Sequence, residues 1–562
     1  MSKEPKIAIF LCNCGKSLSN RLNFAELASA LKKDKSVSLI KEYDLLCTGD
    51  NLQNMVSEVT GKGIGKVIIG GCSPKLYGEL FTGKLKEAGL DANVVAVCNL
   101  REQCAWIYKD SHVAARKALN LLRGTLERIK KADNISEEEI LPENKVLIIG
   151  GGIAGIEAAL ELSKLNISVT IVEKEKELGG NTRKLNSFYQ SHTKPKEFID
   201  EKINGIKGHE EIEVLTNTEV VSLEGSCGDF KAKIKIEKNT VEKHCGAVIV
   251  ATGFETHYSG TDCNLPLSGK VVTQLQLEEI LSNKNEAQKI FGKGEEVSVL
   301  FITGMTGRFS KLSTGTALKN SLLLKERYNN RVFMACRNVL VASEGLERLY
   351  RKTRDEGVII FKFETKAPEF FSRDGELFAL ISDYYLSSQV SEELSNPVIK
   401  IPCDLIVLEE ELTPAGEYEE LKKMLVVSLD PMNFFQKNNV HFFPVDSNRK
   451  GIFFVGSCRG IEEIADVIAD AKSASLKISS LIGGKIIFPK ERIVVDKGKC
   501  TLCLTCQRLC PHGAITYARA AVISEISCQA CGVCASECPN SAITLKTFTD
   551  EGIIAEIEGY VS

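Results

Sequence analysis

The sequence predicts an α/β protein built from several domains, and three features support this. Residues 145–173 place an apolar strand, a glycine-rich turn, a helix and a second strand in that order. Before them, short apolar strands end in cysteines, and after them one cysteine pattern occurs twice near the C-terminus. A chain of 562 residues has room for about three to five domains.

The overall composition is that of an ordinary globular protein. Hydrophobic residues make up 43% of the chain and charged residues 26%, and a net charge of −3 gives no basic footprint for nucleic acid. The first residues enter a strand without a signal-peptide pattern, and no apolar run reaches transmembrane length. We therefore expect a cytoplasmic protein with no membrane span and no nucleic-acid partner, whose 20 cysteines favour metal centres over disulfides.

Residues 1–130 form the first expected domain, an α/β fold with cysteines at its strand ends. Apolar strands at residues 7–11, 66–70 and 94–97 each run into a cysteine-bearing loop. Open α/β sheets place their ligands at the carboxyl ends of parallel strands, so these thiols are candidate ligands. None forms a C-x-x-C pair, and spacing alone leaves an iron–sulfur cluster, structural zinc and buried thiols all open. The cysteines of this domain are Cys12, Cys14, Cys47, Cys72, Cys98 and Cys104.

A linker and a dinucleotide-binding segment follow. Residues 131–144 are charged, contain a proline and are expected to form the linker. The segment then reads G-x-G-x-x-G at Gly150, Gly152 and Gly155. The first glycine turns the chain, the second lets the backbone approach a pyrophosphate, and the third lets the helix pack on the strand. Glu173 ends the second strand, where it can accept the ribose hydroxyls of an adenosine.

FAD is the expected dinucleotide. A Leu-Gly-Gly sequence at 178–180, Arg183, and an Ala-Thr-Gly sequence at 251–253 resemble segments of the two-dinucleotide-binding, thioredoxin reductase-like flavoproteins. The FAD-binding domain would span residues 145–295 and 401–484, with a nucleotide-binding-like insert at 296–400 between its two parts. The candidate FAD-binding residues are Gly150, Gly152, Ala154, Gly155, Glu173, Lys174, Gly180, Arg183, Ala251, Thr252, Gly253, Gly456, Ala465 and Asp466.

The insert has an incomplete nucleotide-binding pattern. A buried strand at 297–302 leads to Gly304 but not to G-x-G-x-x-G, and the next strand ends at Arg337 rather than at an acid. An arginine there suits a 2′-phosphate, yet a pyrophosphate cannot approach closely without the glycine loop. A separate turn in the second part of the FAD-binding domain carries glutamates at 409–411, which would not let the backbone approach a phosphate. We therefore do not expect this insert to bind a pyridine nucleotide directly.

The C-terminal module, residues 492–550, is a duplicated bacterial ferredoxin. The pattern C-x2-C-x2-C-x3-C-P begins at Cys500 and recurs 28 residues later at Cys528. In such pairs the fourth cysteine of each run ligates the other 4Fe–4S cluster. Thiolates this dense are sensitive to oxidation, which suggests an anaerobe. The two expected ligand sets are Cys500, Cys503, Cys506 and Cys538, and Cys528, Cys531, Cys534 and Cys510.

The N-terminal motifs resemble those of the heterodisulfide reductase family, specifically its flavin-bearing A subunit. The resemblance rests on Cys-Asn-Cys-Gly at 12–15, the position of Cys47, Gly-Cys-Ser-Pro-Lys at 71–75 and Asn-Leu-Arg-Glu-Gln-Cys-Ala-Trp at 99–106, and it runs with gaps along most of the chain. It implies an N-terminal 4Fe–4S cluster, although the candidate ligands outnumber the four that one cluster needs. The candidates are Cys12, Cys14, Cys47, Cys72 and Cys104.

The same resemblance implies a role for Lys319, in a helix expected at residues 314–327. It places this lysine beside the flavin ring as the candidate catalytic residue, where a cation would stabilise the reduced, anionic flavin. The alternative is a solvated lysine on the surface of that helix.

The resemblance implies an oxidoreductase, namely an electron-transfer flavoprotein subunit of a heterodisulfide reductase-like complex. Electrons would pass between iron–sulfur clusters and FAD, by simple transfer or by flavin-based electron bifurcation. The implied partners are other redox subunits, ferredoxin, or a hydrogenase or dehydrogenase. Two alternatives stay open: a free-standing NAD(P)H-dependent FAD and iron–sulfur enzyme resembling the small subunit of glutamate synthase, and a scaffold whose N-terminal domain docks partners.

Overall fold

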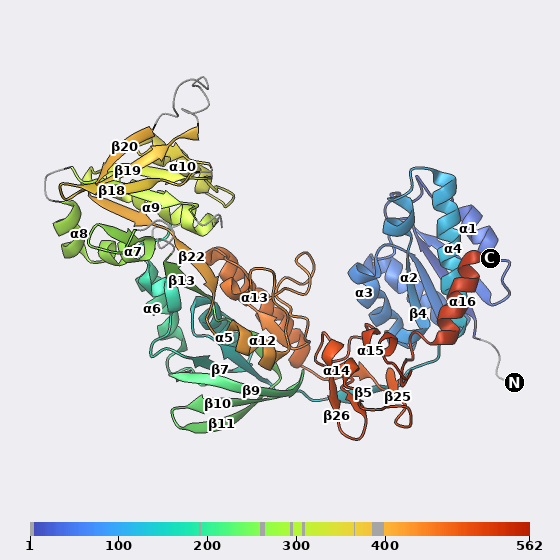
Figure 1. Cartoon of the computed structure of the whole chain (residues 1–562). Helices are drawn as coiled ribbons and strands as arrows, with labels where there is room; N and C mark the ends of the chain where they lie inside the picture. The colour runs from blue at the N-terminus through green and yellow to red at the C-terminus, as the bar shows by residue number, and fades with distance from the viewer. Residues whose placement is uncertain are drawn as a thin grey trace. The chain divides into compact units, whose positions relative to one another are not determined.

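The computed structural model of the chain describes residues 5–189, 193–258, 265–292, 296–305, 310–364, 366–384 and 398–562. It divides into two compact units, residues 1–140 together with 486–562, and residues 141–485 (Figure 1). In the sequence, the second unit is therefore inserted between two halves of the first. Among the helices of the described residues, none is both long enough and apolar enough to cross a membrane.

The N-terminal half of the first unit is a three-layer α/β fold. Its four parallel strands lie in the order β2-β1-β3-β4, and β1 and β3 are buried throughout because helices cover both faces. Helices α1 and α4 contribute to the core on one face, and α2 and α3 to the core on the other. The strands are β1 (Ile7–Cys12), β2 (Val37–Tyr43), β3 (Lys66–Gly71) and β4 (Val95–Asn99), and the helices are α1 (Phe24–Leu31), α2 (Gly49–Lys62), α3 (Pro74–Glu87) and α4 (Ser111–Lys130).

The C-terminal half of the first unit holds the duplicated cysteine runs. Strands β25 and β28 form one antiparallel pair and strands β26 and β27 another, with a short helix within each run. These elements are α14 (Thr505–Leu509), α15 (Val533–Ser536), β25 (Ile493–Val495), β26 (Ile515–Tyr517), β27 (Ala521–Ile523) and β28 (Ile543–Leu545).

A C-terminal helix, α16 (Asp550–Val561), packs on α4 and so joins the two halves of this unit (Figure 1). The helices approach closely because both carry glycine at the contact. A Cβ at Gly124 would lie 2.7 Å from the Glu556 carbonyl oxygen, and one at Gly559 would lie 2.9 Å from the Arg123 carbonyl oxygen. The ferredoxin domain expected to end at residue 550 is thus followed by a helix that belongs to the same unit.

The linker expected at residues 131–144 is partly a strand. Strand β5 (Glu137–Ile140) pairs antiparallel with β24 (Ile486–Pro489), and Lys86 forms an ion pair with Glu137 at 2.6 Å. This two-stranded ribbon closes the first unit at the point where the chain leaves for the second unit and returns from it.

The second unit begins with a parallel sheet in the order β23-β12-β6-β7-β8. Helices α5, α6 and α13 contribute to its buried core, and the antiparallel strands β9, β10 and β11 form a separate sheet. The elements are β6 (Lys145–Ile149), α5 (Ile153–Lys164), β7 (Ser168–Glu173), α6 (Pro195–Ile206), β8 (Ile212–Thr216), β9 (Thr218–Ser226), β10 (Asp229–Ile236), β11 (Asn239–Cys245), β12 (Ala247–Val250), α12 (Tyr418–Leu425), β23 (Ile452–Phe454) and α13 (Ile464–Ile482).

A second parallel sheet, in the order β14-β21-β15-β16-β17, lies within the same unit. Strands β14 and β21 of this sheet lie outside the expected insert, residues 296–400, so the sheet extends beyond it on both sides, as far as the ribbon formed by β13 and β22. The elements are β13 (Phe254–Tyr258), β14 (Val271–Thr273), α7 (Gln274–Ser282), α8 (Lys284–Phe291), β15 (Ser298–Thr303), α9 (Lys311–Tyr328), β16 (Arg331–Cys336), α10 (Leu346–Asp355), β17 (Ile359–Lys362), β18 (Glu369–Arg373), β19 (Glu376–Ser382), β20 (Val398–Cys403), β21 (Leu405–Leu408) and β22 (Glu410–Pro414).

Candidate functional site

The glycine loop after β6 is built as a dinucleotide turn. Gly150 has φ +110°, and a Cβ there would lie 2.5 Å from the carbonyl oxygen of Ala251. At Gly155 a Cβ would lie 2.0 Å from the carbonyl oxygen of Gly150, so this glycine is needed where helix meets strand. Gly152 differs, because a Cβ there would meet nothing within 4 Å. Its open side and the positive end of α5 provide space and charge for a phosphate.

Glu173 shapes the loop from the end of β7. Its Oε2 accepts a hydrogen bond from the N–H of Gly151 at 2.6 Å, and its Oε1 accepts one from the N–H of Glu175 at 2.8 Å. The side chain is buried, and it lines the cavity beside the loop. Because each carboxylate oxygen already binds a backbone amide, Glu173 is held in one orientation.

The loop opens into a cavity of about 1010 Å³, which is at the upper end of the usual range for ligand pockets. Its size, the open side of Gly152 and the helix end fit an extended dinucleotide such as FAD. Of the expected FAD-binding residues, the lining includes Gly150, Gly152, Ala154, Glu173, Lys174, Gly180, Arg183, Ala251, Thr252 and Gly253.

Four expected FAD-binding residues do not line this cavity: Gly155, Gly456, Ala465 and Asp466. Gly155 serves the packing of helix on strand. The Asp466 side chain forms an ion pair with Lys311 at 3.5 Å and is half exposed. At the start of α13, the residues that line the cavity are instead Ile464 and Val467.

Lys319 is a buried cavity residue, so the solvated alternative is wrong. The residue is 8% exposed, and its Nζ lies 2.5 Å from Glu278 Oε1 and 2.7 Å from the carbonyl oxygen of Ser187. Glu278 also accepts hydrogen bonds from Asn320 Nδ2 at 2.6 Å and from the N–H of Asn186 at 2.7 Å. Sequence reasoning missed Glu278, because it lies on α7 and no local motif links it to Lys319.

Four N-terminal cysteines gather at the carboxyl end of the first sheet. The Cys14 sulfur lies 3.7 Å from that of Cys12 and also hydrogen-bonds to Cys72, and Cys47 lies within electrostatic range of Cys12 and Cys72. The hydrogen bond from Cys14 lowers the pKa of Cys12 to about 6 and lowers the pKa of Cys72. Nearby Arg101 lowers the pKa of Cys72 further. The same hydrogen bonds raise the pKa of Cys14, and burial raises that of Cys47, so the thiolate form, which binds iron, is favoured at Cys12 and Cys72.

Cys104 is set apart from these four. It is fully buried in the core between the sheet and helices α1 and α4, together with Cys98. Cys12 instead belongs to the core on the opposite face, where Cys47 also packs. Burial raises the pKa of Cys104 to about 11, as for an inert core thiol.

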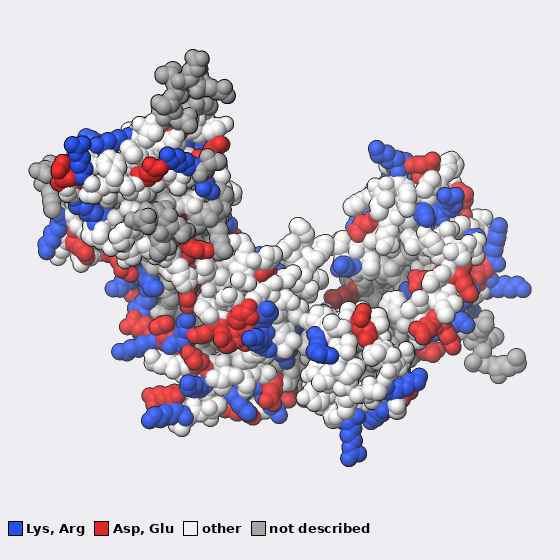
Figure 2. All heavy atoms as spheres, viewed as in Figure 1, with Lys and Arg blue, Asp and Glu red and all other residues white. Residues whose placement is uncertain are grey.

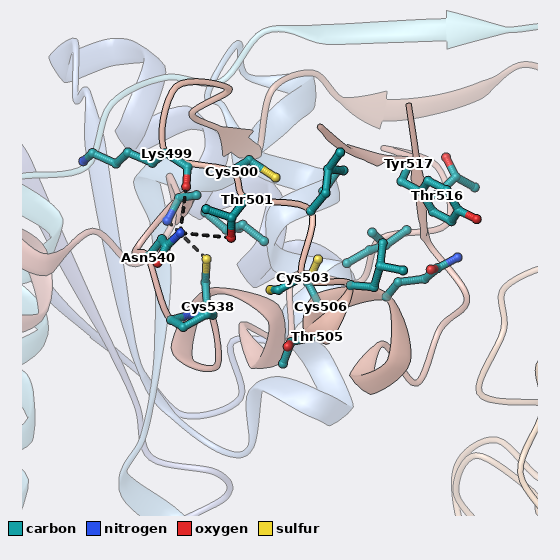
Figure 3. Close-up of a pocket in the computed structure, with 18 residues that line it drawn as sticks. Lys499, Cys500, Thr501, Cys503, Thr505, Cys506, Thr516, Tyr517, Cys538 and Asn540 are labelled. Carbon is teal, nitrogen blue, oxygen red and sulfur yellow. Dashed lines mark hydrogen bonds between the residues drawn. The ribbon is translucent and has the colours of Figure 1, made fainter. Parts of the chain in front are cut away.

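The ferredoxin cysteines surround two small cavities of about 30 Å³ and about 10 Å³. Cys500, Cys503, Cys506 and Cys538 line the first, where their sulfur atoms face a common space (Figure 3). Cys510, Cys528, Cys531 and Cys534 line the second. The structure thus brings together the two sets that the spacing predicts, each with one cysteine from the other run.

Backbone amides also point at these sulfur atoms. The N–H of Ala542 donates to Cys538 Sγ at 3.2 Å, and the N–H of Ala514 donates to Cys510 Sγ at 3.4 Å. Such hydrogen bonds tune the potential of an iron–sulfur cluster. Within the described part of the chain, no three His, Cys, Asp or Glu side chains are grouped to hold a single metal ion. Ligands of a cluster bind separate iron atoms and need not converge on one point.

The remaining cysteines lie in packed interiors. Cys458 is 1% exposed, and its thiol donates to the carbonyl oxygen of Val250 at 3.2 Å. Cys263 lies outside the described residues. The other four, all buried, are Cys227, Cys245, Cys336 and Cys403.

Two protein families match parts of the chain. The family described as pyridine nucleotide-disulphide oxidoreductase matches residues 144–299, and the family described as 4Fe-4S binding domain matches residues 493–516. The thioredoxin reductase of Lactococcus lactis is a similar solved structure, with 17% identity and a TM-score of 0.43 over 60% of this chain and 99% of that one.

Curated relatives match nearly the whole chain, among them A subunits of heterodisulfide reductases and a protein named as like them. The CoB–CoM heterodisulfide reductase A subunit of Methanocaldococcus jannaschii is 26% identical, over 99% of this chain and 98% of its own length. The first of two such subunits in Methanopyrus kandleri is 26% identical over 100% and 98%. The A-subunit-like protein of Archaeoglobus profundus is 24% identical over 92% of both chains.

These matches confirm three expectations from the sequence. The fold is α/β, with an FAD-type oxidoreductase domain followed by a C-terminal ferredoxin domain. The cofactors that these domains bind are FAD and 4Fe–4S clusters. The chain is therefore a flavin and iron–sulfur oxidoreductase that resembles the heterodisulfide reductase A subunit along its whole length.

Proposed function

We propose that this chain is an electron-transfer flavoprotein subunit that exchanges electrons between FAD and three 4Fe–4S clusters. FAD accepts or gives two electrons, whereas each cluster carries one, so together they convert between the two kinds of carrier. The observation that supports this best is the combination in one chain of the cavity of about 1010 Å³ with two four-cysteine sets.

The residues present suit FAD at each part of the cavity. The open side of Gly152 and the end of α5 would hold the phosphates, and Glu173 would hold the adenosine ribose from its fixed orientation. Lys319 and Glu278 line the cavity as a buried ion pair, where they would set the electrostatic environment of the flavin.

The third cluster would be held by Cys12, Cys14, Cys47 and Cys72. Their common location at the end of the sheet supports this choice over Cys104, which is buried in the core on one face. A matched pair of variants tests it. Cys72→Ser is expected to lower the iron content of anaerobically purified protein from about 12 to about 8 atoms per chain, and Cys104→Ser to leave it unchanged. The reverse result would replace Cys72 by Cys104 in the ligand set, and about 8 atoms in the wild type would remove this cluster from the proposal.

We also propose that the chain works in the cytoplasm of an anaerobe as part of a complex with other redox proteins. Two relatives are the A subunits of enzymes named ferredoxin:CoB-CoM heterodisulfide reductase and H2/formate:CoB-CoM heterodisulfide,ferredoxin reductase. Ferredoxin and a hydrogenase or dehydrogenase are accordingly the proposed partners. On the face shown in Figure 2, positive and negative side chains are interspersed, so that face has no broad basic area of the kind that nucleic acid requires. Co-purification of the tagged chain under anaerobic conditions, followed by identification of stoichiometric subunits, tests this assignment.

Flavin-based electron bifurcation is a second mode within the same proposal. One FAD cavity and several clusters in one chain would allow the two electrons of a pair to take separate paths. Coupled reduction of a low-potential and a high-potential acceptor in a one-to-one ratio would support it, and reduction of the high-potential acceptor alone would exclude it.

A further inference from the structure

The two parallel sheets of the second unit share the same order and connections in four of their five strands, and this allows their turns to be compared. Their strand orders are β23-β12-β6-β7-β8 and β14-β21-β15-β16-β17. Strand β15 therefore corresponds to β6, and β21 corresponds to β12. The turn that begins at Gly304 corresponds to the FAD loop at Gly150, and Glu409, directly after β21, corresponds to Ala251.

In the second of these sheets, the side chain of Glu409 occupies the start of the turn after β15. The N–H of Gly304 donates a short hydrogen bond to Glu409 Oε1, and the N–H of Met305 donates to the same oxygen at 3.2 Å. Glu409 is 5% exposed, and Gly304 has φ +81°, so the described start of the turn, Gly304 and Met305, contacts a buried carboxylate. Residues 306–309, which include Gly307 and Arg308, lie outside the described residues.

Backbone amides at such a turn are the usual donors to a dinucleotide pyrophosphate. Here two of them already bind an anion that belongs to the protein. A nucleotide phosphate would have to displace this carboxylate and then lie beside a buried like charge, which is unfavourable. At the corresponding place in the FAD domain, Ala251 has only a methyl group, and the open side of Gly152 faces the cavity.

We propose that Glu409 is an internal anion that occupies the phosphate position of the second nucleotide-type domain and excludes pyridine nucleotides from it. Glu409 is thus a specificity-determining residue: it denies the chain NADH and NADPH as direct electron donors. The neighbouring Glu410 has a separate role, since its Oε1 accepts a hydrogen bond from the N–H of Leu275 at 2.7 Å. This inference concerns the second domain alone and does not depend on the clusters of the proposed function.

The test measures the binding of NADH and NADPH to the full-length, FAD-loaded chain under anaerobic conditions by the fluorescence of the nicotinamide. It is carried out at about pH 8.5, because burial raises the pKa of Glu409 to about 7 and the carboxylate is fully charged only above that pH. Glu409→Ala is expected to bind at least one of them about tenfold or more tightly than the wild type does. Glu411→Ala removes the same charge two residues further along the chain and is expected to resemble the wild type.

A second variant, Glu409→Gln, keeps the shape of the side chain and removes its charge, so it serves if Glu409→Ala loses FAD or fails to fold. It is also expected to bind more tightly than the wild type. The proposal is overturned if neither Glu409 variant gains affinity, if Glu411→Ala gains as much, or if the wild type already binds as tightly as the variants. The FAD and iron contents of each sample report separately on the proposed function.

Discussion

Replacing Lys319 separates two roles that this side chain could have in the cavity. Its Nζ lies 2.5 Å from Glu278 Oε1, and both side chains are buried, so the pair adds almost no net charge beside the bound cofactor. Lys319→Met keeps most of the side-chain volume but leaves the Glu278 carboxylate with two hydrogen-bond donors and no counter-ion. The cavity then gains a net negative charge, which disfavours the reduced, anionic flavin, so its reduction potential should fall.

The size of this fall follows from one unit charge at contact range in a partly screened site, about 1–4 kcal/mol. For a two-electron couple this corresponds to about 20–90 mV. Glu278→Gln is the reciprocal change. It leaves the lysine cation unpaired, so the potential should rise by a similar amount. The double variant removes both charges and should return close to the wild-type value.

Anaerobic redox titration of the flavin in the wild type and the three variants measures these shifts. Breaking a buried ion pair can cost about 3–5 kcal/mol of stability, so FAD content and thermal unfolding must be recorded for each variant. Shifts of the same sign in both single variants, or no shift in either, would refute the reasoning and reduce the pair to a packing contact between α7 and α9.

Individual contacts support three further predictions. Gly152→Val should abolish FAD binding but leave the protein folded and its iron content unchanged, because the valine side chain would enter only the cavity. Gly155→Val should also unfold the domain, because its side chain would meet the Gly150 carbonyl oxygen; flavin and iron analysis checks both variants. Burial raises the pKa of Glu409 to about 7, so the wild type should lose up to about 3 kcal/mol of stability as pH rises from about 4.5 through about 7, and Glu409→Gln should not; denaturation across that range tests this. Gly559→Leu should separate α16 from α4 and lower the melting temperature of the first unit but not FAD retention, which calorimetry and flavin analysis can show.

Local patterns predict the parts of the fold in which adjacent residues determine the structure. The strand, glycine loop and acid of the FAD segment lie within 29 consecutive residues, 145–173, and their sequence spacing leaves one arrangement in space. The same holds for the two ferredoxin runs, where the spacing alone specifies which cysteine crosses to the other set.

The contacts that sequence reasoning missed join elements far apart in the chain. Glu278 meets Lys319 only because α7 and α9 pack on one sheet, and Glu409 meets Gly304 only because β21 lies next to β15. From the sequence alone β21 is assigned to the FAD domain, because the apolar pattern of a strand does not indicate which of two sheets it will join. Choosing between Cys72 and Cys104 also needs the fold, since Cys104 is buried on one side of the sheet while Cys72 joins the thiols at its carboxyl end.

The division into two units explains why flavin and iron should respond independently to substitution. Helix α16 ties the ferredoxin half to α4, so all twelve proposed cluster ligands belong to one compact unit, while the whole FAD cavity belongs to the other. The chain passes between the units twice, at the ribbon of β5 and β24. A change confined to the cavity, such as Gly152→Val, therefore alters a different unit from the one that holds every proposed ligand. Loss of iron in that variant would mean that cluster assembly requires bound FAD, a dependence that the contacts within each unit do not provide.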